Sequence, residues 1–106
     1  MPTPILTLVF KALANPKRRR IYQIICRHEG RRGRGMPLER VRRLAGMKQP
    51  AVSHHVARLA AAGLVLRRRD GRRVSCAPCP QARRILLRFA RNPASFPPED
   101  RGTRDP

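Results

Sequence analysis

Residues 44–63, LAGMKQPAVSHHVARLAAAG, constrain the fold of this chain more than any other stretch. They predict the end of one helix, a tight turn at 46–48 and a second helix from Gln49, because the proline that follows suits the first turn of a helix. At about 100° per residue, one stripe of the second helix holds Val52, Val56, Leu59 and Gly63. The side chains that point away from this stripe are Ser53, His54, Ala57 and Arg58. One face is therefore expected to pack against a core, and the other to be free for a partner.

The helix before the turn has a matching apolar pattern. Its expected core face consists of Leu38, Val41, Leu44 and Ala45, which recur at helical spacing. Two short amphipathic helices around a glycine-containing turn form a helix-turn-helix, a motif whose second helix places its N-terminal part in the DNA major groove.

These residues are part of a longer resemblance. The chain resembles the ArsR/SmtB family of winged helix-turn-helix regulators in QPAVSHHVARLAAAGLV, in the RRRDGRRV shortly after it, and in FKALANPKRRRI nearer the N-terminus. The resemblance covers residues 9–77. It implies a mainly α fold with a small β-hairpin wing (α+β), about five helices in all, and a homodimeric repressor.

Two helices are expected before the motif. Residues 5–14 carry apolar side chains at helical spacing, namely Ile5, Leu8, Val9, Ala12 and Leu13. Asn15 followed by Pro16 is a helix start signal, and the second helix should run to about His28. Its expected buried side chains are Ile21, Ile24, Ile25 and His28. The glycine-rich basic segment 30–36 is expected to be a loop, either close to the DNA backbone or simply a connector.

A β-hairpin and a last helix are expected after the motif. The runs 64–69 and 72–77 are strand-like, and Asp70-Gly71 between them is a favoured two-residue hairpin turn. The last helix should span Gln81 to about Arg91, with Ile85, Leu86 and Phe89 on one face. The domain is thus expected to occupy residues 1–92, and the proline-rich segment 93–106 to be a flexible tail.

The charge of the chain indicates a polyanionic partner. It carries 25 basic and 6 acidic residues, a net charge of +19, and before residue 99 the acidic residues are only Glu29, Glu39 and Asp70. Such a basic footprint is typical of nucleic-acid-binding domains. A general bias toward arginine, which supplies 22 of the 25 basic residues, is the alternative explanation.

The polar side chains of the motif divide into two expected roles on DNA. Base reading requires hydrogen-bonding tips at the exposed start of the second helix, and the candidates are Gln49, Ser53, His54 and Arg58. Phosphate contacts fix affinity and orientation, and their candidates are Lys48, His55, Arg68, Arg69, Arg72 and Arg73. For His55, packing against the preceding helix is an equal alternative. The resemblance implies dimerisation through the first and last helices, where the apolar candidates are Ile5, Leu8, Val9, Ile85, Leu86 and Phe89.

The metal sites known in the resembled family are not expected here. The family's thiolate positions fall on Pro37 and Glu39, and the site on the last helix lacks ligands, because no histidine follows His55 and that helix has no acidic residue. Cys76 and Cys79 form a CxxC pair without the second pair that a structural zinc site needs. No metal and no cofactor are therefore expected.

Three cysteines remain as candidates for a thiol sensor: Cys79, Cys76 and Cys26. An odd count argues for a reducing cytosol rather than a disulfide scaffold. Cys79 should precede the last helix with Arg83 and Arg84 nearby, a setting that favours a thiolate. Cys76 is expected to be a small buried hydrophobe of the wing.

The resulting hypothesis is a homodimeric, sequence-specific double-stranded DNA-binding repressor of the ArsR type in a bacterial or archaeal cytosol. The sequence does not identify the inducer, if any, that would release it from DNA. One alternative is a weakly specific architectural binder of nucleic acid, and another is a sensor of thiol oxidation or of a small ligand. No catalytic constellation was found, so an enzyme is not expected. The apolar segment 5–13 is too short to span a bilayer, and no membrane association is expected.

Overall fold

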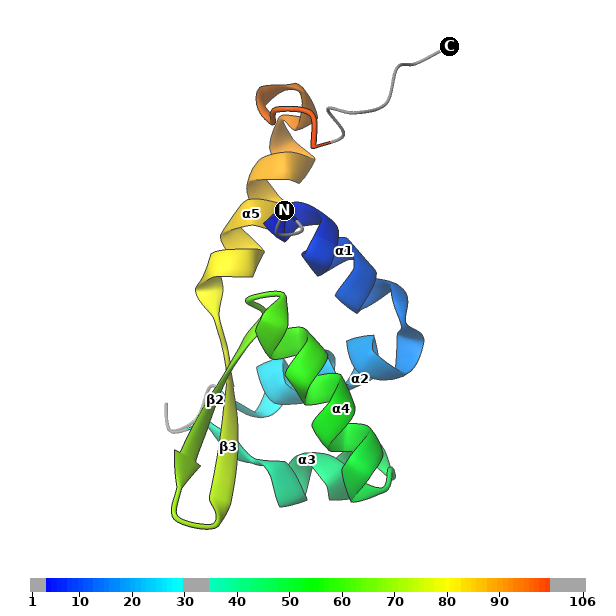
Figure 1. Ribbon diagram of the computed structural model, residues 1–106, viewed down its shortest axis with the longest axis vertical. Coiled ribbons are helices and arrows are strands. Elements are labelled where there is room, and N and C mark those ends of the chain that lie inside the picture. The colour runs from blue at the N-terminus through cyan, green and yellow to red at the C-terminus, as the bar shows by residue number, and fades with distance from the viewer. Residues whose placement is uncertain (1–3, 30–34, 100–106) are drawn as a thin grey trace.

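The computed structural model describes residues 4–29 and 35–99. In chain order the elements are α1 (Ile5–Ala14), α2 (Pro16–Glu29), β1 (Met36–Pro37), α3 (Leu38–Ala45), α4 (Gln49–Ala61), β2 (Val65–Asp70), β3 (Arg73–Pro78), α5 (Pro80–Arg91) and the short 3-10 helix Pro93–Ser95. Figure 1 shows α3, the start of α4 and the tip of the β2–β3 hairpin at one end of the molecule, with α1 and α5 at the other. The predicted winged helix-turn-helix fold is confirmed.

The junction of α1 and α2 forms as the sequence predicts. The backbone N–H of Arg18 donates to Oδ1 of Asn15 across 3.1 Å, so Asn15 caps α2 and satisfies one of its unpaired donors. Ile21, Ile24 and Ile25 are buried in the core, as expected. His28 is exposed instead, which corrects the prediction that it packs.

The helix-turn-helix turns at Gly46. This residue has φ +66 and its N–H donates to the carbonyl oxygens of Arg42 and Arg43, a left-handed cap that glycine adopts without strain. Val41 and Ala45 are buried, but Leu44 is 41% exposed, which corrects its assignment to the core face. At about 100° per residue, Leu44 lies some 60° beyond Val41, on the side away from Leu38 and Ala45.

The wing hairpin is shifted by one residue from the expected turn. Asp70 pairs with Arg73, so the two central residues are Gly71 and Arg72 rather than Asp70 and Gly71. Among the residues that the structure describes, positive φ occurs only at glycines, and Gly71 has φ +62. Positive φ at the first central residue alone is the pattern of a type II′ turn, which leaves Asp70 in the ladder.

The structure contains a third strand that the sequence patterns did not predict. Met36 and Pro37 of β1 pair with Cys76 and Ser75 of β3, and the sheet order is β1-β3-β2. A two-residue strand has no periodicity to detect. Gly35 brings the chain to this edge with φ +80, where a Cβ would lie 3.0 Å from the Cys76 carbonyl oxygen. Residues 30–34 of the expected glycine-rich loop lie outside the described residues.

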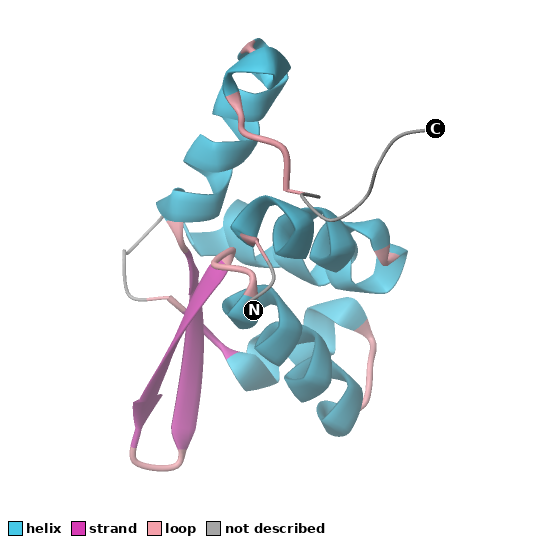
Figure 2. Cartoon of the chain, turned by 45° about the horizontal axis from the view of Figure 1, so that its top comes forward, coloured by secondary structure: helices cyan, strands magenta, loops and turns pink. Residues whose placement is uncertain are grey.

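Figure 2 shows the helices gathered around the base of the hairpin, and buried side chains from these elements form the core. Its fully buried larger side chains come from α1, α2, α3, α4, the residue before β2 and the strands: Ile21, Ile25, Leu59, Leu64, Val9, Val41, Val52, Val56, Val65 and Cys76. The side chains of β2 beyond Val65 are exposed, so the outer part of the hairpin projects from the core (Figure 2). The sheet thus anchors the wing at its base and leaves the tip free.

The segment after α5 packs back onto that helix. The rings of Phe89 and Phe96 meet edge to face with centroids 5.5 Å apart, and Thr7 donates a hydrogen bond to Glu99. Residues 93–99 of the expected tail therefore have a defined place, while 100–106 and 1–3 lie outside the described residues. Within the described chain, no helix has the length and apolar character needed to cross a bilayer.

Candidate nucleic-acid interface

The exposed face of α4 follows directly from its buried face. Val52, Val56 and Leu59 are at most 1% exposed, and they fix the rotation of the helix about its axis. The candidates for base reading then face outward: Gln49, His54 and Arg58 are exposed and Ser53 is half-buried. Lys48, just before the helix, is exposed as well. All the positions proposed for base reading are thus accessible to a partner.

His55 is different and corrects the prediction that it contacts the DNA backbone. Its side chain is only 9% exposed, and its Nδ1 accepts a hydrogen bond from Nε of Arg18 across 3.4 Å. Burial lowers the pKa of His55, and the nearby charges of Arg18, His54 and Lys17 lower it further. The imidazole therefore tends to stay neutral and acts as an internal acceptor.

Arg18 is a residue of this face that the sequence analysis missed. It comes from the first turn of α2, far from α4 in sequence, and it is half-buried against α4. Burial and the charge of Arg58 both lower its pKa, burial being the larger cause. The sequence signal was the run of basic residues at the start of α2, where positive charge opposes the helix dipole.

The wing presents an array of arginines. Arg68 and Arg69 on β2, and Arg72 and Arg73 at the turn, are all exposed. In the part of the chain that the structure describes, the one ion pair joins Arg42 and Glu39 at 2.6 Å. Its hydrogen bond holds the pKa of Glu39 below the ordinary value. The wing arginines are therefore not neutralised by described carboxylates.

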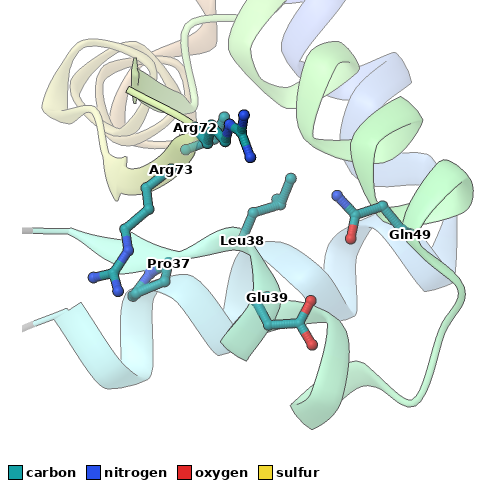
Figure 3. Close-up of a pocket in the computed structure, with 7 residues that line it drawn as sticks. Pro37, Leu38, Glu39, Gln49, Arg72 and Arg73 are labelled. Atoms are coloured by element: carbon teal, nitrogen blue, oxygen red, sulfur yellow. The ribbon is translucent and has the colours of Figure 1, made fainter. Parts of the chain in front are cut away.

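A hollow of about 470 Å³ separates the wing from the helix-turn-helix. Gln49 borders it from α4, Leu38 and Glu39 from α3, and Arg72 and Arg73 from the wing. In Figure 3 the Gln49 amide points toward Leu38, and the Glu39 carboxylate points away from the two arginines. The hollow thus brings a candidate for base reading and two candidates for phosphate contact to one place.

The cysteines do not share one environment. Cys76 is completely buried, as predicted, and burial raises the pKa of its thiol to about 11. Cys26 and Cys79 are half-buried. The pKa of Tyr22 is raised by burial, by a hydrogen bond with Cys26 and by both thiols, while Arg83 opposes the shift. Cys26 of α2 and Cys79 before α5 therefore lie around the same tyrosine.

Metal ligands do not cluster in the described residues. No group of three or more His, Cys, Asp or Glu side chains close enough to hold an ion occurs among them. Pro37 and Glu39, the positions of the family's thiolate site, border the hollow beside the wing.

The faces of α1 and α5 carry the candidates for dimerisation. Ile5 is 37% exposed, and Leu8, Ile85, Leu86 and Phe89 are half-buried. Val9 is completely buried in the core of its own chain, so its assignment to a dimer interface is corrected. Phe10 was not among the dimerisation candidates predicted from the sequence. It is 46% exposed, and its ring meets that of Phe89 edge to face with centroids 5.6 Å apart. This end of the molecule thus presents an apolar surface.

Comparison with known proteins agrees with this architecture. A family model described as a helix-turn-helix domain matches residues 13–68, more than half of the chain. A search of the curated proteins gave no match.

Several solved structures share the fold. An ArsR-like transcriptional regulator from Rhodococcus sp. RHA1 is 22% identical with a TM-score of 0.70, over 86% of this chain and 81% of that one. NolR from Sinorhizobium fredii is 26% identical with a TM-score of 0.61, over 82% of each chain.

A third similar structure is the homodimeric winged helix-turn-helix DNA-binding domain of a possible ArsR-family regulator from Mycobacterium bovis. It is 23% identical with a TM-score of 0.64, over 87% of this chain and 82% of that one. With the matched family model, these likenesses lead to one conclusion: the chain belongs to the helix-turn-helix domain family, and its winged helix-turn-helix fold is that of the ArsR-family transcriptional regulators.

Proposed function

We propose that this chain is a sequence-specific, double-stranded DNA-binding repressor that works as a homodimer in the cytoplasm and is not an enzyme. The observation that carries the proposal is the placement of two features at one end of the molecule. These are the exposed polar face of α4 and the unneutralised arginines of the wing (Figure 1). A helix of this kind fits the major groove, and a basic hairpin beside it reaches the flanking backbone.

The roles of the side chains follow from their positions. Gln49, Ser53 and His54 lie in the first two turns of α4, the part of a recognition helix that contacts base edges. The residues proposed to bind phosphates are all exposed, which supports this role: Lys48, Arg68, Arg69, Arg72 and Arg73. Phosphate contacts supply affinity, whereas contacts to base edges supply sequence preference.

A homodimer accounts for the apolar end of the molecule. Ile5, Phe10 and Phe89 supply part of the apolar surface on α1 and α5, and the similar Mycobacterium bovis domain is described as homodimeric. A two-fold dimer places two recognition helices on one side of the duplex, about one helical turn apart. The matching DNA site is a pseudo-palindrome.

Competition binding tests the proposal. The purified protein is used to select duplexes from a random pool, and the selected site is then competed with random DNA at near-physiological salt. A repressor should prefer its site by about 10³-fold or more. Equal affinity for selected and random duplexes would support the architectural binder instead.

A thiol-sensing function is a second candidate, favoured by the partial exposure of Cys26 and Cys79, which leaves both thiols within reach of an oxidant. Oxidation of either thiol to a sulfenic acid would transfer two electrons to an oxidant such as hydrogen peroxide, which gives one oxygen atom to the sulfur and leaves as water. Cys76 is unsuited, because its buried thiol has a pKa raised to about 11 and the thiolate is the reactive form.

Thiol labelling tests this second candidate. We expect iodoacetamide to modify Cys26 and Cys79 faster than Cys76 in the folded protein. Mild oxidation should then protect the first two and change DNA affinity. Unchanged affinity after complete oxidation of both thiols would remove the sensing function and leave DNA binding intact.

A further inference from the structure

The most informative unexplained feature is a pair of arginines from different helices. Arg18 lies in the first turn of α2, and its guanidinium reaches α4, where Nε donates to Nδ1 of His55. Arg58 lies three residues after His55 on α4, so the two side chains share one flank of that helix. The proximity of the arginines is also evident in the pKa of Arg18, which burial and the charge of Arg58 lower.

No described carboxylate balances this pair. The one ion pair within the described ranges lies elsewhere, between Arg42 and Glu39. Lys17 adds a third positive charge near His55. Lys17 and Arg18 lie in the first turn of α2, where the helix dipole favours an anion and disfavours a cation. His55 is buried and tends to be neutral, so it orients Arg18 without adding charge. Such a concentration of positive charge is relieved by an anion bound from outside.

The position of the pair identifies that anion as a DNA phosphate. Arg58 lies four residues after His54 and is exposed like it, so both occupy the outward face of α4. When the start of α4 lies in the major groove, the side chains one turn further along approach the edge of the groove, where the backbone runs. Two guanidinium groups side by side match the several acceptor oxygens of one phosphate.

We propose that Arg18 and Arg58 bind the same backbone phosphate of the DNA, and that His55 is the positioning residue that holds Arg18 in place. This inference rests on the proposed DNA-binding function and deepens it. It adds α2 to the contact surface and gives Arg58 a phosphate as its partner in place of a base edge. The protein then contacts the DNA backbone on both sides of α4, through the wing on one side and through the start of α2 on the other.

The salt dependence of binding tests the shared phosphate. The probe is a mixed-sequence duplex of about 30 base pairs, and the proteins are wild type, Arg18→Gln, Arg58→Gln and the double variant. Each phosphate neutralised contributes about 0.9 to the slope of log K against log salt. If one phosphate is shared, each single variant weakens binding by roughly tenfold with a small change of slope. The double variant should then flatten the slope by about 0.9.

Other slopes overturn the proposal. If the slope of the double variant is flatter by about 1.8, the two arginines contact two separate phosphates, and if its slope is unchanged, they contact none. A loss confined to Arg58→Gln and to one selected sequence, with Arg18→Gln unaffected, shows that Arg58 reads a base. Arg84→Gln is the matched control, because Arg84 is an exposed arginine on α5, at the other end of the molecule. Its slope should equal that of the wild type.

The role of His55 is tested by rescue. His55→Gln keeps a hydrogen-bond acceptor for Arg18 and should retain wild-type DNA affinity, whereas His55→Leu removes the acceptor and should bind like Arg18→Gln. Equal affinity of the Leu and Gln variants would overturn the positioning role. Circular dichroism verifies that each variant is folded. If the wild type binds no duplex at all, the proposed function itself fails; if it binds and the double variant matches it, only the shared phosphate fails.

Discussion

Nε of Arg18 lies 3.4 Å from Nδ1 of His55 and donates a hydrogen bond to it, which ties the start of α2 to the middle of α4. The bond requires that Nδ1 carry no proton, so the neutral imidazole must keep its own proton on Nε2. Protonation of His55 would turn this contact into a repulsion between two cations. The orientation of the recognition helix is therefore coupled to the charge of one buried side chain.

The first prediction concerns the stability of the fold against pH. Burial lowers the pKa of His55 in the folded state, and Arg18, His54 and Lys17, which face it from α2 and α4, lower it further. In the unfolded chain the pKa returns to about 6.5. The unfolded state then binds more protons below this pH, so the free energy of unfolding should fall as the pH drops from about 7 toward about 5. Thermal melting across this range should show it.

Two variants separate His55 from the other titrating groups. His55→Gln should flatten the dependence of Tm on pH. His54→Gln, which removes an exposed imidazole next to it on the same helix, should leave most of the dependence in place. Identical pH profiles for the wild type and His55→Gln would contradict the coupling.

The second prediction locates the turn of the wing. Gly71 has φ +62 with open space around it, so an alanine there meets no clash but adopts a left-handed conformation that costs about 1–2 kcal/mol. Asp70 lies in the strand ladder opposite Arg73, and Asp70→Thr should change the free energy of unfolding by less than about 0.5 kcal/mol. Urea unfolding measures both. A Thr variant as unstable as Gly71→Ala would place Asp70 inside the turn after all.

The third prediction separates base reading from phosphate contact. Gln49→Ala should reduce the preference for the selected site over random DNA, because a good bidentate contact with a base gives about 1–3 kcal/mol of discrimination. Arg72→Ala should weaken binding to all duplexes about equally and flatten the salt slope by about one unit. Fluorescence anisotropy on both kinds of duplex at several salt concentrations measures these effects. Equal losses on both duplexes for Gln49→Ala would argue against its role.

The fourth prediction concerns assembly. Phe10 is 46% exposed on α1, and Phe10→Glu would place a charge in the proposed dimer interface without emptying the core. We expect sedimentation to show a monomer, with a marked loss of affinity for the pseudo-palindrome. Leu66→Glu is the matched control for sedimentation alone, because Leu66 is 59% exposed on the wing, outside the proposed dimer interface, and this variant should remain dimeric. A dimeric Phe10→Glu protein would exclude this surface as the interface.

Local sequence patterns were sufficient for most of the elements. The glycine at 46 and the proline at 50 delimit the two helices of the motif, and Asn15 with Pro16 starts α2, because caps and turns depend on neighbouring residues alone. The stripe of Val52, Val56 and Leu59 also fixed which face of α4 is exposed. The candidates for base reading could therefore be predicted from α4 by itself.

Tertiary structure decided what depends on residues far apart in the chain. The sequence shows that His55 and Arg18 are polar, but only the packing of α2 on α4 joins them and withdraws His55 from the surface. Val9 and Phe10 are neighbours on α1, yet Val9 is buried in the core and Phe10 is exposed. β1 exists only because β3 offers an unpaired edge next to it. Hydrogen bonds and burial between distant segments leave no periodic trace in sequence, whereas caps, turns and amphipathic faces do.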